Sequence, residues 1–247
     1  MKSRLFVVLA VVMCLVSAAW AQDCSKDTIT VIGIGKVTAK PDVAYVTLSV
    51  KADGILMADT AQKVKQKLDE IEKAIKAKKD GIKEIVTSDV AIGQKDSAWS
   101  SDEKDVARPQ IVKQMRVTIA PDPQIAHDIV DAAIRAGASM DVSDSYSYSR
   151  YLDNVIVYGL IKSEEAEAQA QAKALEDARA KAAKLAALAG KTLGGVTSIG
   201  CDSSSSWSYQ LSNMMRGGME FPTTNLGLDP SKIDITHTMS VSFELLK

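Results

Sequence analysis

The side chains best suited to catalysis or metal binding are few in this chain of 247 residues, and they lie far apart in the sequence. The two histidines, His127 and His237, could pair as metal ligands only if the fold brought them together. No serine stands in the glycine-flanked strand-to-helix turn of a hydrolase nucleophile, so a Ser-His-Asp arrangement has no support. We therefore predict surface or structural roles for both histidines, and we predict no catalytic residue, no bound metal and no cofactor.

Three methionines, Met214, Met215 and Met219, lie close together in a stretch rich in serine. Their thioethers are soft ligands that suit Cu(I), and they can be oxidised reversibly to sulfoxides. Methionine also packs adaptably in loops and at interfaces. We favour the packing role, and we keep soft-metal binding and oxidant scavenging as alternatives.

The Gly33-Ile34-Gly35 motif has two of the glycines of a dinucleotide-binding turn. It lacks the third glycine and the helix that would have to follow. The two glycines therefore predict close backbone packing or a β-bulge in this strand.

Residues 1–21 have the layout of a secretory signal peptide. A short basic start precedes an apolar run over residues 5–16, and small residues end the segment at Ala21. A membrane-spanning helix needs ~20 apolar residues, and neither this run nor any later one reaches that length. We expect cleavage after Ala21 and export of a mature chain, residues 22–247, to the periplasm without a transmembrane segment.

The charge of the mature chain excludes one class of partner. Removing Lys2 and Arg4 with the leader leaves 28 of the 30 basic side chains against 31 acidic ones, a formal charge of −3. A protein that binds nucleic acid needs a concentrated positive surface. We therefore expect no nucleic-acid partner.

Two cysteines, Cys24 and Cys201, remain after Cys14 leaves with the leader. An even pair in an oxidising compartment predicts an intrachain disulfide. Free thiols or an intermolecular bond are the alternatives. Asp23 stands directly before Cys24, where lipoprotein processing requires a small residue, and this argues against a lipid anchor.

Two segments show the periodicity and the end signals of amphipathic helices. In the first, apolar residues recur at spacings of three and four between Asp59, a predicted N-cap, and Gly81, a predicted stop. The second is predicted to begin at Asp122 as N-cap, with Pro123 in the first turn, and to end at Gly137.

A third and longer helix is predicted from residue 163 to residue 189, before Gly190. It is rich in alanine, which would let its axis approach a neighbouring element closely. We expect an ion pair between Asp177 and Lys181 on its solvated face. Its predicted apolar seam consists of Ala168, Leu175, Ala178, Ala182, Leu185 and Ala189.

Alternation and β-branched residues predict strands at 28–37, 43–50, 82–92, 111–120, 141–151, 155–158, 196–201 and 233–246. The first two are expected to form a hairpin around Pro41, and residues 202–232 a long exposed loop. The element order contains a split βαβ pattern, in which helices cover one face of a sheet. We therefore predict an α+β fold with a largely antiparallel sheet, a ferredoxin-like core and helices packed on one face.

A series of short motifs runs through the mature chain: Ile32–Gly35, Pro41–Ala44, Gly81–Ile82, Ile85–Ser88, Asp177–Ala182, Gly190, Leu193–Gly194 and Val196. In their order and spacing, from Thr28 to Leu246, they resemble the SIMPL-domain family of exported proteins. The resemblance implies an α+β domain of the cell envelope. The family includes members that assemble into large ring-like or channel-like homo-oligomers, and others linked to protection under oxidative stress.

No catalytic residues are carried over by this resemblance. We therefore expect a non-enzymatic exported envelope protein that acts by homo-oligomeric assembly or by binding an envelope partner, with stress protection as the implied role. An enzyme with an unrecognised site is the alternative. The chain departs from the family pattern at residues 141–154 and in its long Ser/Met loop.

Overall fold

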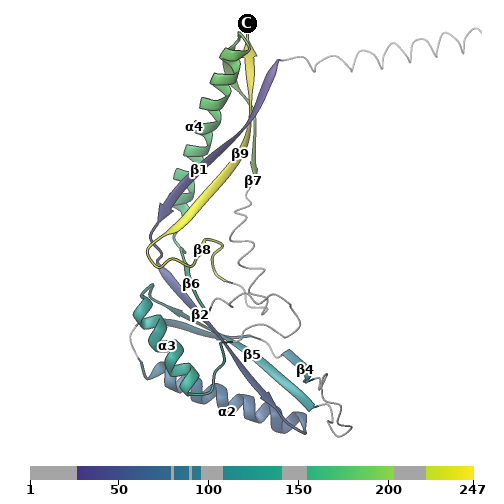
Figure 1. The fold of residues 1–247 in the computed structure, drawn as a ribbon, viewed down its shortest axis with the longest axis vertical. Helices are drawn as coiled ribbons and strands as arrows, with labels where there is room; N and C mark the ends of the chain where they lie inside the picture. Colours follow the sequence, from purple (N-terminus) through teal and green to yellow (C-terminus); the bar gives the residue numbers. More distant parts are fainter. Residues whose placement is uncertain (1–26, 79–80, 89–90, 96–107, 141–154, 203–220) are drawn as a thin grey trace, which may run out of the picture. The chain divides into compact units, whose positions relative to one another are not determined.

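The computed structural model of the chain describes residues 27–78, 81–88, 91–95, 108–140, 155–202 and 221–247. These residues form three helices and nine strands, coloured by sequence position in Figure 1. They divide into two compact units. The three-stranded unit comprises residues 27–35, 170–202 and 237–247, and the six-stranded unit comprises the described residues of 36–169 and 221–236.

Along the chain the elements are β1 (Thr28–Ala39), β2 (Val43–Asp53), α2 (Met57–Lys76), β3 (Ile82–Thr87), β4 (Ala91–Lys95), β5 (Arg108–Ile119), α3 (Pro123–Arg135), β6 (Ile156–Gly159), α4 (Glu164–Leu188), β7 (Thr192–Asp202), β8 (Leu226–Gly227) and β9 (Ile233–Leu246).

The six-stranded sheet has the order β3-β5-β2-β6-β8, with β4 paired to β5, and its pairings are antiparallel. Helix α2 connects β2 to β3 with β5 between them, and α3 connects β5 to β6 with β2 between them. This is the split βαβ order of a ferredoxin-like sheet. The predicted α+β class, with antiparallel strands and helices packed on a sheet, is confirmed.

One face of this sheet forms an aliphatic core with α2 and α3, which lie along the same side of the strands in Figure 1. Successive side chains of a strand point to opposite faces, so alternate residues of β2, from Ala44 to Val50, point to the helices. Burying each large aliphatic side chain stabilises the fold by about 1.5–3 kcal/mol. The other fully buried residues of this core include Ile71, Ile75, Val117, Ile119 and Ile129.

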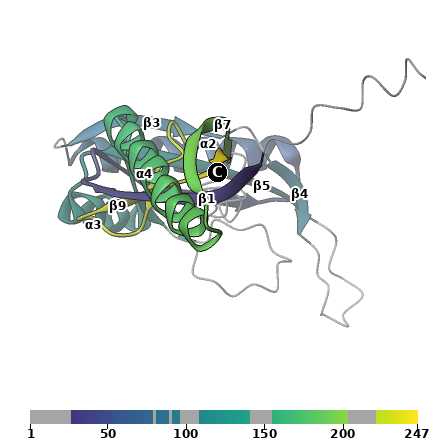
Figure 2. The same cartoon turned by 90° about the horizontal axis from the view of Figure 1, so that it is seen from above.

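The three-stranded sheet has the order β1-β9-β7, and α4 packs against it. Figure 2, seen from above, shows α4 crossing over β1 and β9. Its core brings small helix residues against larger strand residues: Val31, Ala174, Ala178, Ala182, Met239, Val241 and Phe243.

The predicted hairpin between the first two strands is wrong. Strands β1 and β2 do not form a hairpin, because β1 pairs with β9 while β2 pairs with β5 and β6. The predicted strand 82–92 is two strands, β3 and β4, which both pair with β5. The predicted strand 141–151 lies outside the described residues.

The helix ends agree with the sequence prediction at α3 and not at α2, which ends at Lys76 with Ala77 as C-cap and not at Gly81. Asp122 caps α3 by accepting hydrogen bonds from the backbone N–H groups of Gln124 at 2.8 Å and Ile125 at 3.4 Å. Helix α2 begins at Met57 after Leu56, which makes no side-chain cap, so Asp59 lies in the first turn and is not the N-cap.

The buried stripe of α4 follows a different register from the predicted seam. Every fourth residue is buried: Ala170, Ala174, Ala178, Ala182 and Ala186. The prediction is confirmed for Ala178 and Ala182, and Leu175 is half-buried. It is wrong for Ala168, Leu185 and Ala189, which are exposed. In a helix with alanine on most sides, side-chain type no longer distinguishes the packed face.

Candidate functional site

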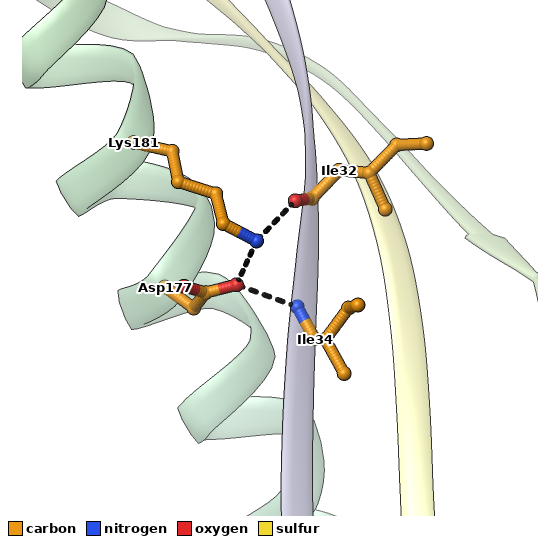
Figure 3. A network of polar contacts seen from close by, with 4 residues as sticks. All are labelled: Ile32, Ile34, Asp177 and Lys181. Atoms are coloured by element: carbon orange, nitrogen blue, oxygen red, sulfur yellow. Dashed lines mark hydrogen bonds and ion pairs between the residues drawn. The ribbon is translucent and has the colours of Figure 1, made fainter.

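Side chains of α4 bond the outer backbone edge of strand β1 (Figure 3). The Ile34 N–H donates to Asp177 Oδ2 at 2.8 Å, and Lys181 Nζ donates to the Ile32 carbonyl oxygen at 3.0 Å. Lys181 Nζ also donates to Asp177 Oδ2 at 2.6 Å. The predicted ion pair is therefore present, and it also covers a strand edge that would otherwise be open to another chain.

These contacts set the ionisation of the carboxylate. The hydrogen bond from Lys181, followed by the one from the Ile34 N–H, lowers the pKa of Asp177 below its ordinary value. The charged form of Asp177 is therefore the one that holds helix and strand together.

Gly33 and Gly35 let α4 approach β1 at backbone distance. A Cβ added at Gly33 would lie 2.0 Å from the Ala174 carbonyl oxygen, and one at Gly35 would lie 1.9 Å from the Ala170 carbonyl oxygen. Both distances are far inside van der Waals contact, so only glycine fits. The prediction of close backbone packing at this motif is confirmed.

The opposite edge of the same sheet, strand β7, has no comparable cover within the described ranges. β7 pairs with β9 on one side. It carries no charged residue between Thr192 and Cys201, and its register with β9 is regular from Ser198 to Asp202. Natural proteins usually protect such an edge with charges or a covering element, because it can pair with another chain.

Exposed aliphatic side chains accompany this edge. Val196 and Ile199 lie opposite two core residues of β9, yet they are 39% and 53% exposed because the alanine stripe packs on β1 and β9. On the other face, Ile32 and Ile34 are 57% and 53% exposed. Figure 3 shows their side chains pointing away from α4. We call strand β7 with Val196 and Ile199 the β7 edge.

A buried polar cluster lies in the six-stranded unit, on the sheet face away from α2 and α3. Across strands β2 and β5, Tyr45 stands opposite Thr118 and Thr47 opposite Arg116. All four residues are nearly inaccessible to solvent, with exposures of 0% to 6%. We call these four residues the Arg116 cluster.

Three hydroxyl groups of the Arg116 cluster have no hydrogen-bond partner among the described residues: those of Tyr45, Thr47 and Thr118. A buried hydroxyl without a partner costs about 1–3 kcal/mol. Folded proteins contain few such groups, and each one points to a bound water, an ion or a functional role.

The guanidinium of Arg116 lies near two aromatic rings. Its guanidinium carbon lies 5.7 Å from the centroid of the Tyr45 ring and 5.8 Å from that of Phe221. The two rings meet edge to face at 5.1 Å. Arg116 Nη2 is 3.9 Å from Glu84 Oε2, which is longer than a hydrogen bond.

The phenol of Tyr45 keeps its proton at physiological pH. Burial raises the pKa of Tyr45 to about 12, and the nearby Arg116 charge opposes only part of that rise. The cluster therefore presents a guanidinium and three hydroxyls that can all donate hydrogen bonds. It contains no histidine, cysteine or carboxylate that could act as a nucleophile or general base.

Reasoning from sequence alone missed this cluster. Thr47 and Ser49 in β2, and Gln114, Arg116 and Thr118 in β5, alternate with aliphatic residues. That pattern is typical of strands with one solvated face. Whether that face is covered depends on distant segments, which the local pattern does not reveal.

The two histidines of the sequence prediction lie in different units, His127 in α3 and His237 in β9. Over the described ranges, no three His, Cys, Asp or Glu side chains are grouped as they would be around a metal ion. None of the described helices is both long enough and apolar enough to cross a bilayer.

The other candidate residues of the sequence prediction are two cysteines and three methionines. Cys24 and the side chain of Cys201 lie outside the described residues, so the disulfide stays a prediction. The same holds for the roles considered for the three methionines, which are Met214, Met215 and Met219.

Comparison with known proteins agrees with the fold and the motifs. No curated protein matches the chain. A family model described as "SIMPL: Protein of unknown function (DUF541)" matches residues 29–243. The match begins in β1 and ends in β9, so it includes the glycine motif, the ion pair on α4 and the Arg116 cluster. With most of the chain matched, the protein belongs to the SIMPL (DUF541) family.

Proposed function

We propose that this chain is a non-enzymatic, exported protein of the cell envelope that acts through homo-oligomeric assembly, with the β7 edge as the contact between subunits. The observation that supports assembly is strand β7, which is paired on one side, has no charged residue from Thr192 to Cys201 and carries the exposed side chains of Val196 and Ile199. Binding of another envelope protein at this edge is the alternative use of the same surface.

A second copy of the chain suits this edge better than an unrelated strand. Two β7 strands related by a twofold axis would pair antiparallel, and each copy would offer the other the same segment, which has no charged residue from Thr192 to Cys201. The same pairing would shield Val196 and Ile199 from water.

The difference between the two sheet edges limits this pairing. Asp177 and Lys181 cover the outer edge of β1, so each three-stranded sheet has one edge available within the described residues. β-Pairing therefore closes at two subunits and does not extend into a fibre. Larger rings would need a further contact between such pairs.

Light scattering of the mature protein tests the assembly. At tens of micromolar we expect a mass of at least two chains, and Ile199→Lys should reduce it to one chain because a buried lysine opposes edge pairing. Ile55→Lys is the matched control, since Ile55 is 82% exposed in the other unit. A strictly monomeric unmodified protein would contradict the proposal.

Export is the second part of the proposal. It is supported by the basic start, the short apolar run and the small residues of the segment 1–21, and by the family resemblance. N-terminal sequencing of protein from the periplasmic fraction should begin at Gln22. Retention of Met1, or recovery in the inner membrane, would count against export.

Protection under oxidative stress is the third part, and it is supported by the resemblance to stress-linked members of the family. A strain without this protein should survive hydrogen peroxide less well than its parent. If assembly is required, the Ile199→Lys variant should not restore survival while Ile55→Lys should. Equal survival of the deleted and parent strains would remove this role.

A further inference from the structure

The Arg116 cluster has no part in the proposed assembly. It lies in the six-stranded unit, whereas the β7 edge lies in the three-stranded unit. Ligand binding at this cluster can therefore be measured independently of the oligomeric state.

The cluster offers a donor set on one sheet face. Because Tyr45 stands opposite Thr118 and Thr47 opposite Arg116, the four side chains occupy adjacent positions of two neighbouring strands. Directly opposed residues in an antiparallel pair have Cβ atoms about 4.5–5.5 Å apart. Groups of a few atoms can therefore contact more than one of these side chains at once.

The chemistry of these donors selects an anionic oxygen ligand. A guanidinium is charged at all physiological pH values and matches the planar geometry of carboxylate and phosphate. Each of the three hydroxyls can donate one hydrogen bond, and each lacks a partner among the described residues. A cation would be repelled by Arg116.

Glu84 shows that a carboxylate is drawn towards this cluster without entering it. Its Oε2 lies 3.9 Å from Arg116 Nη2, and its side chain is 56% exposed, so it stands at the solvent-facing rim. A ligand that approached from this side would compete with the Glu84 carboxylate for Arg116.

We propose that the Arg116 cluster binds an oxyanion, the carboxylate or phosphate group of a small molecule. Arg116 supplies the charge, and the hydroxyls of Tyr45, Thr47 and Thr118 donate hydrogen bonds to the anionic oxygens. The aromatic rings of Tyr45 and Phe221 hold the guanidinium in place.

Thermal unfolding of the mature protein tests this binding. Sodium acetate and inorganic phosphate are each compared with sodium chloride at equal ionic strength and pH. Because a ligand of the folded state stabilises it by mass action, at least one oxyanion should raise Tm by a few degrees above chloride. Phosphate and other kosmotropic salts also stabilise folded proteins without binding, so only the part of the rise that Arg116→Gln lacks reports the site. Such a rise with acetate alone identifies a carboxylate ligand, and one with phosphate alone a phosphate ligand. No rise with either overturns the proposal.

Substitutions locate the site. Arg116→Gln should abolish the oxyanion-specific rise, while Arg135→Gln should retain it, since the Arg135 side chain is 81% exposed in α3. Glu84→Gln should strengthen binding severalfold, because it removes a competing carboxylate. An unchanged rise in Arg116→Gln, or weaker binding in Glu84→Gln, would contradict the assignment.

The double variant Thr47→Val with Thr118→Val separates binding from simple hydration, and it decides the question if Arg116→Gln does not fold. We expect about tenfold weaker oxyanion binding, because hydrogen bonds to a charged ligand are lost. The ligand-free Tm should rise, since two buried hydroxyls without partners are replaced by methyl groups. A lower ligand-free Tm with unchanged oxyanion binding would show that the hydroxyls hold only water.

Discussion

At the scale of single residues, two glycines set the distance between a helix and a strand. Gly33 and Gly35 place the β1 backbone against the carbonyl oxygens of Ala174 and Ala170, at positions where a Cβ cannot fit. This close approach brings the side chains of α4 within hydrogen-bond reach of the β1 backbone. The covered edge of β1 therefore depends on the absence of two methyl groups.

Gly33→Ala should destabilise the protein, because its Cβ would lie 2.0 Å from the Ala174 carbonyl oxygen and would force α4 away. Overpacking of this kind costs about 1–3 kcal/mol, or more where backbone must move. Gly195→Ala is the matched control, since a Cβ there meets nothing within 4 Å. Urea unfolding measures both, and equal stabilities of the two variants would contradict the packing.

Asp177→Asn should make stability less dependent on pH in acid. The folded protein lowers the pKa of Asp177 below its ordinary value of 3.8, chiefly through Lys181 and then the Ile34 N–H. The charged Asp177 carboxylate therefore contributes its full stabilisation at pH values above its pKa in the unfolded chain. This stabilisation is lost as the pH falls through the lower pKa that Asp177 has in the folded protein.

The Tm difference between the parent protein and Asp177→Asn should be largest near neutral pH and should decrease below about pH 4. Glu176→Gln, an exposed position of the same helix, serves as the control for a general change in charge. A difference that persists unchanged in acid would show that the Asp177 carboxylate does not hold β1.

At the scale of elements, the alanine stripe of α4 shows which features a sequence can predict. The helix, its end before Gly190 and the burial of Ala178 and Ala182 follow from composition and spacing. The register of the stripe does not, because Leu185 is the larger side chain and yet is 47% exposed. The packed face is chosen by the glycines of β1, about 140 residues earlier in the sequence.

Ala182→Leu should cost about 1–3 kcal/mol through overpacking, because Ala182 is fully buried against the three-stranded sheet. Ala183→Leu, one residue further along α4, is exposed and should change stability by less than ~0.5 kcal/mol. Thermal unfolding of the pair checks the stripe. Similar losses in both variants, or none in either, would place the packed face elsewhere.

Strand pairing sets a second limit on prediction from sequence. The ferredoxin-like order of the six-stranded sheet follows from the alternation of helices and strands. The partner of β1 does not, because a nearby strand such as β2 is the simplest local choice, whereas β9 lies near the other end of the sequence. The Arg116 cluster was missed for a related reason, since burial of a polar strand face depends on distant chain segments.

At the scale of the whole molecule, the two units offer different properties to a partner. The three-stranded unit has one strand edge covered by Asp177 and Lys181 and one edge, β7, without such cover among the described residues. The six-stranded unit has a buried donor cluster. The family match covers both units.

Hydrogen exchange at β7, followed as a function of protein concentration, reports directly on whether this strand pairs between subunits. Amides from Ser198 to Cys201 lie in the regular part of the proposed pairing edge. Those that point away from β9 should exchange slowly at tens of micromolar and much faster on dilution or in Ile199→Lys, because pairing between subunits protects them. Fast exchange of these amides in an assembled protein, or exchange that does not change with concentration across the assembly transition, would show that β7 does not pair between subunits.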